Sequence, residues 1–168
     1  LTPNQRHTLW AAASRAVRTP TRFDSDVTIT PRKFDSEKIA AFELGYRVRP
    51  AEKVLLSFAT FFNKYNDLRS LDSAESPAPP IILANSQQAE SWGIEFTGNY
   101  QLNTKWRLRA GYIYFEKDIW ATSRVVLPVS EAFEGVDPKN QFMLQSILDL
   151  PADLQLDVLS RYIEGLSE

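Results

Sequence analysis

The stretch that decides the fold is EKIAAFELGYRVR, residues 37–49. In its second half every other residue is apolar: Phe42, Leu44, Tyr46 and Val48. The residues between them are charged or glycine: Glu43, Gly45, Arg47 and Arg49. A side-chain period of two predicts a β-strand with one apolar and one polar face.

The same alternation recurs along the chain. WGIEFTGNYQL and WRLRAGYIY alternate most cleanly, whereas KVLLSFATFF carries Leu55 and Phe61 on its more polar side. The segment that starts at His7 is rich in alanine, and its facing is ambiguous. About seven strands are expected, over residues 7–17, 37–49, 53–62, 92–102, 106–114, 140–150 and 154–164.

The connections between these strands alternate strictly in length. Short links are expected at Pro50–Lys53, Asn103–Thr104 and Pro151–Asp153. Long links are expected at Thr19–Ser36, Asp67–Gln87 and Asp118–Lys139, and every proline is expected outside the strands. Soluble β-proteins favour short hairpins at both ends of a sheet. Outer-membrane barrels combine short periplasmic turns with long extracellular loops, so the pattern favours such a barrel.

The aromatic residues fit the same interpretation. Trp92 and Tyr100 share a face eight residues apart, as do Trp106 and Tyr114. Eight residues span roughly 26 Å of strand, or about 20 Å along the normal of a tilted strand. This is close to the lipid-facing band between two aromatic girdles. The alternative, cross-strand aromatic pairs in the core of a soluble protein, remains open.

The composition excludes several function classes. The chain has 168 residues, no cysteine and one histidine, His7, so thiolate chemistry and a histidine-based metal site or triad are not expected. No catalytic residue and no metal ligand stands out, which argues against an enzyme. The net charge of -2 gives no reason to expect nucleic acid as a partner. No run approaches the ~18 apolar residues of a membrane helix.

Six segments in a fixed order cover nearly the whole chain. They are HTLWAAASRAVRTPTRFD (7–24), EKIAAFELGYRVRP (37–50), LLSFATFFNKYNDLRS (55–70), NSQQAESWGIEFTGNYQL (85–102), WRLRAGYIYFEKD (106–118) and GVDPKNQFMLQSILDLPADLQLDVLSRYIEGL (135–166). By their order and spacing, these segments resemble the barrel of TonB-dependent outer-membrane receptors.

The resemblance implies an all-β fold of antiparallel up-and-down strands that is a partial segment of a large transmembrane β-barrel. Residues 1–168 would then come from the C-terminal half of a barrel of roughly twenty-two strands. The plug domain, the TonB-binding segment and the final strands are expected outside this chain. The implied location is the outer membrane of a Gram-negative bacterium, with lipid, the plug and TonB as partners.

The polar faces supply one group of candidate site residues. In a barrel they would face the lumen, where they would pair with the plug or line a substrate path, unless the lumen is merely wet and polar. These lumen-facing candidates are Glu43, Arg47, Glu95, Asn99, Arg107 and Arg109.

The long links supply candidate ligand-binding residues. Arginine suits anionic chelates and aromatic rings suit flat ligands. The candidates are Arg22, Phe23, Arg32, Tyr65, Arg69, Trp120, Arg124 and Phe133. The function that the resemblance implies is TonB-dependent active uptake of a scarce ligand, such as an iron chelate (a siderophore or similar). A passive porin-like or adhesin-like barrel and a soluble β-sheet protein that binds a small ligand remain as alternatives.

Overall fold

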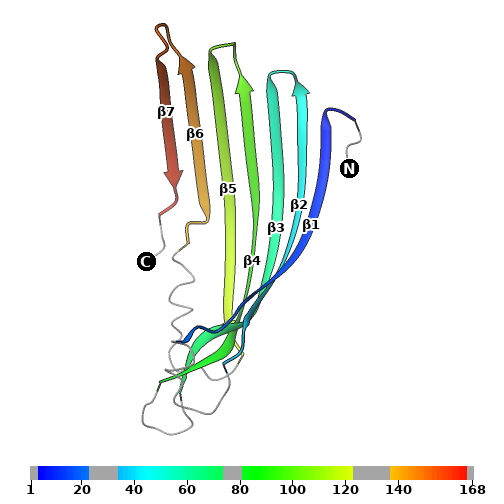
Figure 1. The fold of residues 1–168 in the computed structure, drawn as a ribbon, viewed down its shortest axis with the longest axis vertical. Helices are drawn as coiled ribbons and strands as arrows, with labels where there is room; N and C mark the ends of the chain where they lie inside the picture. Colours follow the sequence, from blue (N-terminus) through cyan, green and yellow to red (C-terminus); the bar gives the residue numbers. More distant parts are fainter. Residues whose placement is uncertain (1–3, 23–33, 74–80, 123–136, 166–168) are drawn as a thin grey trace.

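The computed structural model describes residues 4–22, 34–73, 81–122 and 137–165, and within them it forms one seven-stranded antiparallel sheet. The strands lie side by side in chain order (Figure 1). They are β1 His7–Arg18, β2 Glu37–Ala51, β3 Val54–Ser73, β4 Ile81–Gln101, β5 Trp106–Ala121, β6 Asn140–Asp149 and β7 Gln155–Ile163. The predicted all-β, up-and-down fold is therefore confirmed. Among the described residues, no helix is long and apolar enough to cross a membrane.

The three short turns lie at one end of the sheet, here called the turn end, and the opposite end of the sheet is here called the loop end (Figure 1). The predicted extent of two long links is wrong. β3 continues to Ser73, β4 already begins at Ile81, and β5 continues to Ala121. The added pairing passes two register shifts, beside Tyr65 and Leu68, and Asp67 adopts a positive φ of 57°. Polar residues can extend the ladder because backbone groups alone make its hydrogen bonds.

The expectation that every proline lies outside the strands is also wrong, because β2 includes Pro50. The pairing of β2 with β3 shifts between Val48 and Ala51, so Pro50 sits where the ladder is irregular. A proline has no backbone N–H and is accommodated at such an irregularity near a strand end.

The strand register defines two faces, because directly paired residues point to the same side of a sheet. Phe42 lies opposite Phe62, and Phe62 lies opposite Trp92, so the apolar sides of three strands merge into one surface. We call this surface the outer face and its opposite the inner face. Large exposed residues of the outer face include Phe42, Leu44, Phe58, Phe62, Trp92, Ile94, Tyr100, Tyr112, Phe142 and Leu144.

The apolar band on the outer face runs obliquely across the strands. On β6 the band ends at the polar residue Asn140, which lies opposite Tyr114. On β5 the band ends at Glu116, two residues beyond Tyr114 toward the loop end. Glu116 lies opposite Trp92, and on β4 the band ends at Glu90, two residues beyond Trp92 toward the loop end. On β3 the boundary stays level with that on β4. The shift averages a little over one residue per strand, which corresponds to strands tilted by about 40° against the band.

The inner face holds the most buried residues whose face the register defines: Gly45, Gln87, Ala89, Ser91, Gly93 and Ile147. Crowding on this side indicates that the inner face is the concave one. Close contacts across glycines add to it, since a Cβ on Gly45 would lie 2.1 Å from the ring of Trp10. The side chain of Trp10 therefore lies across Gly45, and no larger residue could occupy that position without displacing it.

Candidate functional site

The six polar candidates of the strands all lie on the inner face. Paired positions connect them: Arg109 lies opposite Asn99, and Arg107 lies opposite Gln101. Glu43 lies opposite Phe61, and Glu95 lies between Ala59 and Ile113, both nearer the middle of the sheet. The register thus brings the candidates onto one surface. Their exposure to a barrel lumen remains a prediction.

Arginines gather on the inner face toward the turn end, from β2 to β7. Arg161, which the sequence analysis did not single out, lies in the same cross-strand row as Arg47. The Arg47 Nε donates to Ser57 Oγ at 3.3 Å, and the Nε of Arg107 is buried without a hydrogen-bond partner. None of Arg47, Arg107, Arg109 and Arg161 pairs with a carboxylate of the described residues. The arrangement therefore leaves positive charge available on this surface.

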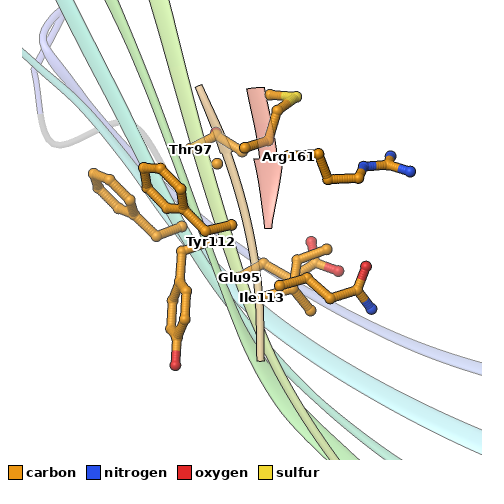
Figure 2. A pocket seen from close by; sticks show the side chains of 10 residues that line it. Glu95, Thr97, Tyr112, Ile113 and Arg161 are labelled. Carbon is orange, nitrogen blue, oxygen red and sulfur yellow. The ribbon is translucent and has the colours of Figure 1, made fainter. Parts of the chain in front are cut away.

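A small hollow opens in the inner face beside these arginines, with a volume of about 190 Å³. Thr97 and Gly111 form its floor, because neither carries a large side chain. Glu95 and Arg161 both border the hollow, and Figure 2 shows Arg161 and Tyr112 projecting to opposite sides of the sheet. Opposite charges beside one shallow hollow can bind a polar chain segment or a zwitterionic group.

The loop end presents charges that already have partners. Glu37 accepts from Arg18 Nη1 at 2.6 Å and from the backbone N–H of Arg69 at 2.9 Å. Lys38 Nζ lies 2.6 Å from the carboxylate of Asp67. These contacts connect the ends of β1, β2 and β3 and hold the loop end together.

Asn85 forms the second connection at the loop end. Its Nδ2 donates to the carbonyl oxygens of Asp35 at 3.0 Å and Asp67 at 2.7 Å, and its Oδ1 accepts from the N–H of Asp35 at 2.8 Å. One amide side chain therefore links the segment before β2 to β3 and β4. Sequence reasoning placed Asn85 in a loop and missed this role, because its partners lie 50 and 18 positions away.

The loop candidates lie in different surroundings. Tyr65 is half-buried on the inner face of β3, and Arg69 lies within the second register shift near the end of that strand. Trp120 lies opposite Gln88, on the outer face beyond the apolar band, and Arg22 is exposed after β1. Phe23, Arg32, Arg124 and Phe133 lie outside the described residues. Among the four candidates that the structure describes, the strand register pairs none with another.

Charged and hydroxyl groups line the loop-end border of the apolar band. The Tyr114 hydroxyl donates to Glu116 Oε2 at 2.5 Å, and Lys139 Nζ donates to Glu116 Oε1 at 2.6 Å. The hydrogen bond with Glu116 raises the pKa of Lys139, which precedes β6. These groups mark the border where the apolar surface gives way to a polar one.

Nothing in the described part of the chain resembles a reaction centre. Its histidine, aspartate and glutamate side chains form no group of three or more that could hold a metal ion. His7 Nδ1 lies 2.6 Å from the hydroxyl of Tyr46, and the two rings stack on the outer face. The arrangement separates an apolar surface from a polar one, as the wall of a membrane barrel does.

Comparison with known proteins agrees with this geometry. A family model described as "TonB dependent receptor-like, beta-barrel" matches residues 1–163. No curated protein matches the chain.

Solved structures share the fold at low sequence identity. The FrpB iron transporter from Neisseria meningitidis is 13% identical with a TM-score of 0.76, covering 96% of this chain and 25% of that one. The alcaligin outer-membrane receptor FauA from Bordetella pertussis is 18% identical with a TM-score of 0.63, covering 96% and 27%. The copper transporter OprC is 17% identical with a TM-score of 0.64, covering 94% and 24%. This chain spans about a quarter of the length of each.

Proposed function

Because the chain belongs to the TonB-dependent receptor β-barrel family, we propose that it forms part of the wall of an outer-membrane transporter that imports a scarce ligand, an iron chelate of the siderophore kind. The observation that carries the proposal is the two-faced sheet. Its outer face bears an oblique apolar band, and its inner face bears the arginines and glutamates.

The proposed division of labour follows the two faces. The outer face contacts lipid and holds the barrel in the membrane. The inner face, with Glu43, Glu95 and the turn-end arginines, borders the space that a plug domain elsewhere in the protein would occupy. TonB would supply energy from the inner membrane and move the plug. No step of this transport requires a reaction at a residue of this chain.

The ligand class rests on chemistry at the loop end and on similar proteins. FrpB is named an iron transporter, which supports a ligand that carries iron. OprC is named a copper transporter, so copper is the second candidate. Arg22 and Arg69 could contact an anionic chelate through forked hydrogen bonds, and Tyr65 could stack against a flat one.

Deletion of the gene that encodes this chain tests the proposal. Under iron limitation, with single ferric chelates as the iron source, the deletion is expected to abolish growth on one chelate and leave growth on the others unchanged. Deletion of TonB should abolish the same uptake. Ligand uptake that continues without TonB would instead support a passive porin-like barrel. Growth that fails only under copper limitation would replace iron by copper.

A further inference from the structure

A second hollow lies on the outer face, within the apolar band and close to the turn end. Its volume is about 490 Å³. Gly98 on β4 and Ala110 on β5 lie opposite each other and form its floor, since neither side chain fills the space. Leu56 and Leu144 border it on the flanking strands β3 and β6. The hollow is a shallow apolar trough cut into the surface that the proposed function turns toward lipid.

The long axis of the trough follows the strands. Phe96 closes it toward the loop end, and Tyr100 and Leu108 border it toward the turn end. Tyr100 lies four positions after Phe96, which is roughly 13 Å along the strand. An extended hydrocarbon chain suits the chemical character of such a trough, because no charged side chain borders it.

In contrast to the apolar lining, polar groups lie at the end of the trough that is nearest the turn end. Tyr100 is 46% exposed, and its hydroxyl makes no hydrogen bond with any residue that the structure describes. By contrast, the other two aromatic groups near this border are occupied within the protein: Tyr46 Oη contacts His7 Nδ1, and Trp106 Nε1 donates to Ser146 Oγ at 3.0 Å. Among these three aromatic residues, only Tyr100 therefore has a polar group left to bind a molecule outside the described protein.

Two lysines flank the strand end that carries Tyr100. Lys53 lies in the turn between β2 and β3, where its carbonyl accepts from the N–H of Gln101 at 2.8 Å. Its Nζ reaches the Leu102 carbonyl at 3.3 Å, so the ammonium group lies over the end of β4. Lys105 is exposed in the turn between β4 and β5. Glu52 is the single carboxylate in these two turns, which leaves an excess of positive charge beside the trough.

We propose that this trough is a binding site for one glycerophospholipid with an anionic headgroup. One acyl chain lies over Gly98 and Ala110, between Phe96 and Tyr100. The Tyr100 hydroxyl donates to an oxygen of the phosphate or ester, and Lys53 and Lys105 neutralise the phosphate charge. The site would hold its lipid longer than the uniform apolar surface around it. This inference rests on the proposed function, which turns the outer face toward the membrane.

Gly98 offers a substitution that fills the trough without straining the backbone. A Cβ at Gly98 would meet Leu56 at 3.5 Å and Phe96 at 3.6 Å, which are ordinary contacts. Gly98→Leu should therefore fold and occupy the trough with its own side chain. Ala13→Leu is the matched control, because Ala13 lies on the outer face of β1, opposite Phe42 and away from the trough.

The full-length protein that carries this chain is reconstituted in vesicles of phosphatidylethanolamine and phosphatidylglycerol, with a phosphatidylglycerol probe that bears a photoreactive acyl chain. After irradiation, mass spectrometry locates the lipid adducts. We expect adducts to concentrate on Leu108 and Leu144 and to fall at least threefold in Gly98→Leu but not in Ala13→Leu. The headgroup contacts are tested by Tyr100→Phe and by Lys53→Gln combined with Lys105→Gln, each of which should lower the same adducts.

Three outcomes would overturn the site. Adducts spread evenly over the outer face would show bulk lipid only. Crosslinks between two copies of the protein at the trough, lost in Gly98→Leu, would show a protein interface instead. Adducts that favour inner-face residues would contradict the membrane orientation itself, and with it the proposed function, whereas the first two outcomes leave that function intact.

Discussion

The two faces of the sheet use the same strands in opposite ways. On the outer face large apolar side chains such as Leu44 and Ile94 stand half exposed, and few polar groups interrupt them. On the inner face the strands pack closely, with glycines beneath the rings of Trp10 and Phe61 and charged residues between them. An ordinary soluble sheet buries its apolar face and exposes its polar one. Here the apolar face is the more exposed one.

This difference indicates where the stabilising interactions of each face come from. Side chains on the outer face also touch one another, as Phe58 and Phe96 do with ring centroids 4.8 Å apart, but they stay half exposed, so their full burial depends on lipid or on a partner. Side chains on the inner face gain from contacts within the chain, such as the stacking of Phe61 and Phe115 with ring centroids 6.3 Å apart. A substitution should therefore have a different cost on each face, even between residues close together on one strand.

The largest expected effect is a charge placed on the outer face. Ile94 is 47% exposed near the middle of the apolar band, where an arginine would meet hydrocarbon. Ile94→Arg should destabilise the inserted protein by about 2–4 kcal/mol. The measurement is a urea titration of the full-length protein in lipid vesicles, followed by tryptophan fluorescence.

The matched control is Thr97→Arg, three residues along β4 and on the inner face. It should change the free energy of unfolding by less than about 1 kcal/mol, since an arginine there meets water or polar groups. Equal costs for the two variants would contradict the assignment of the faces.

A smaller effect is expected from adding one methyl group to a glycine. A Cβ at Gly93 would lie 2.4 Å from the carbonyl oxygen of Tyr114 and 2.6 Å from Cζ of Phe61. The first of these atoms belongs to the backbone and cannot move away without disturbing the pairing of β4 with β5. Gly93→Ala should therefore cost about 1–3 kcal/mol in the same titration.

Gly98→Ala makes the same chemical change on the other face. The added Cβ would lie 3.5 Å from its nearest neighbour, Leu56. The substitution should therefore change the free energy of unfolding by no more than about 0.5 kcal/mol. If both alanines were tolerated equally, the close packing of the inner face would not constrain the strands as described.

Much of the fold could be predicted from the sequence because a period of two encodes the face of each side chain directly. Strand positions and the apolar sides of β2 to β5 follow from residues such as Phe42 and Trp92. The facing of β1 did not follow, since Ala11, Ala12 and Ala13 carry almost no contrast between faces. Only the register with β2, in which Leu9 lies opposite Tyr46, places its apolar side.

The site was less accessible to sequence reasoning. The inner-face location of Glu43 and Arg109 follows from alternation, but the proximity of Arg161 to Thr97 and Gly111 depends on the register of four strands. The sequence analysis missed the part of β3 after Asp67 and the part of β4 before Gln87, because the asparagine and serine residues there favour turns as well as hydrogen-bonded ladders. Trp120 could be assigned to the outer face only once β5 was known to continue without a shift.

A further small effect is expected from the loss of one hydrogen bond at the turn-end border of the outer face. Trp106 Nε1 donates to Ser146 Oγ at 3.0 Å, between β5 and β6. Trp106→Phe removes the donor and keeps an aromatic ring, so the expected cost is about 0.5–1.5 kcal/mol. Ser146→Ala removes the acceptor, and the double variant should cost less than the two single costs added together, because both remove the same bond. Additive costs in the titration would mean that the bond contributes nothing in lipid.

The inner face offers a comparison, where Gln145 Nε2 donates to Asp157 at 2.8 Å in a more polar setting. Gln145→Ala should cost less than Trp106→Phe, since water can replace a lost partner on the inner face but lipid cannot on the outer one.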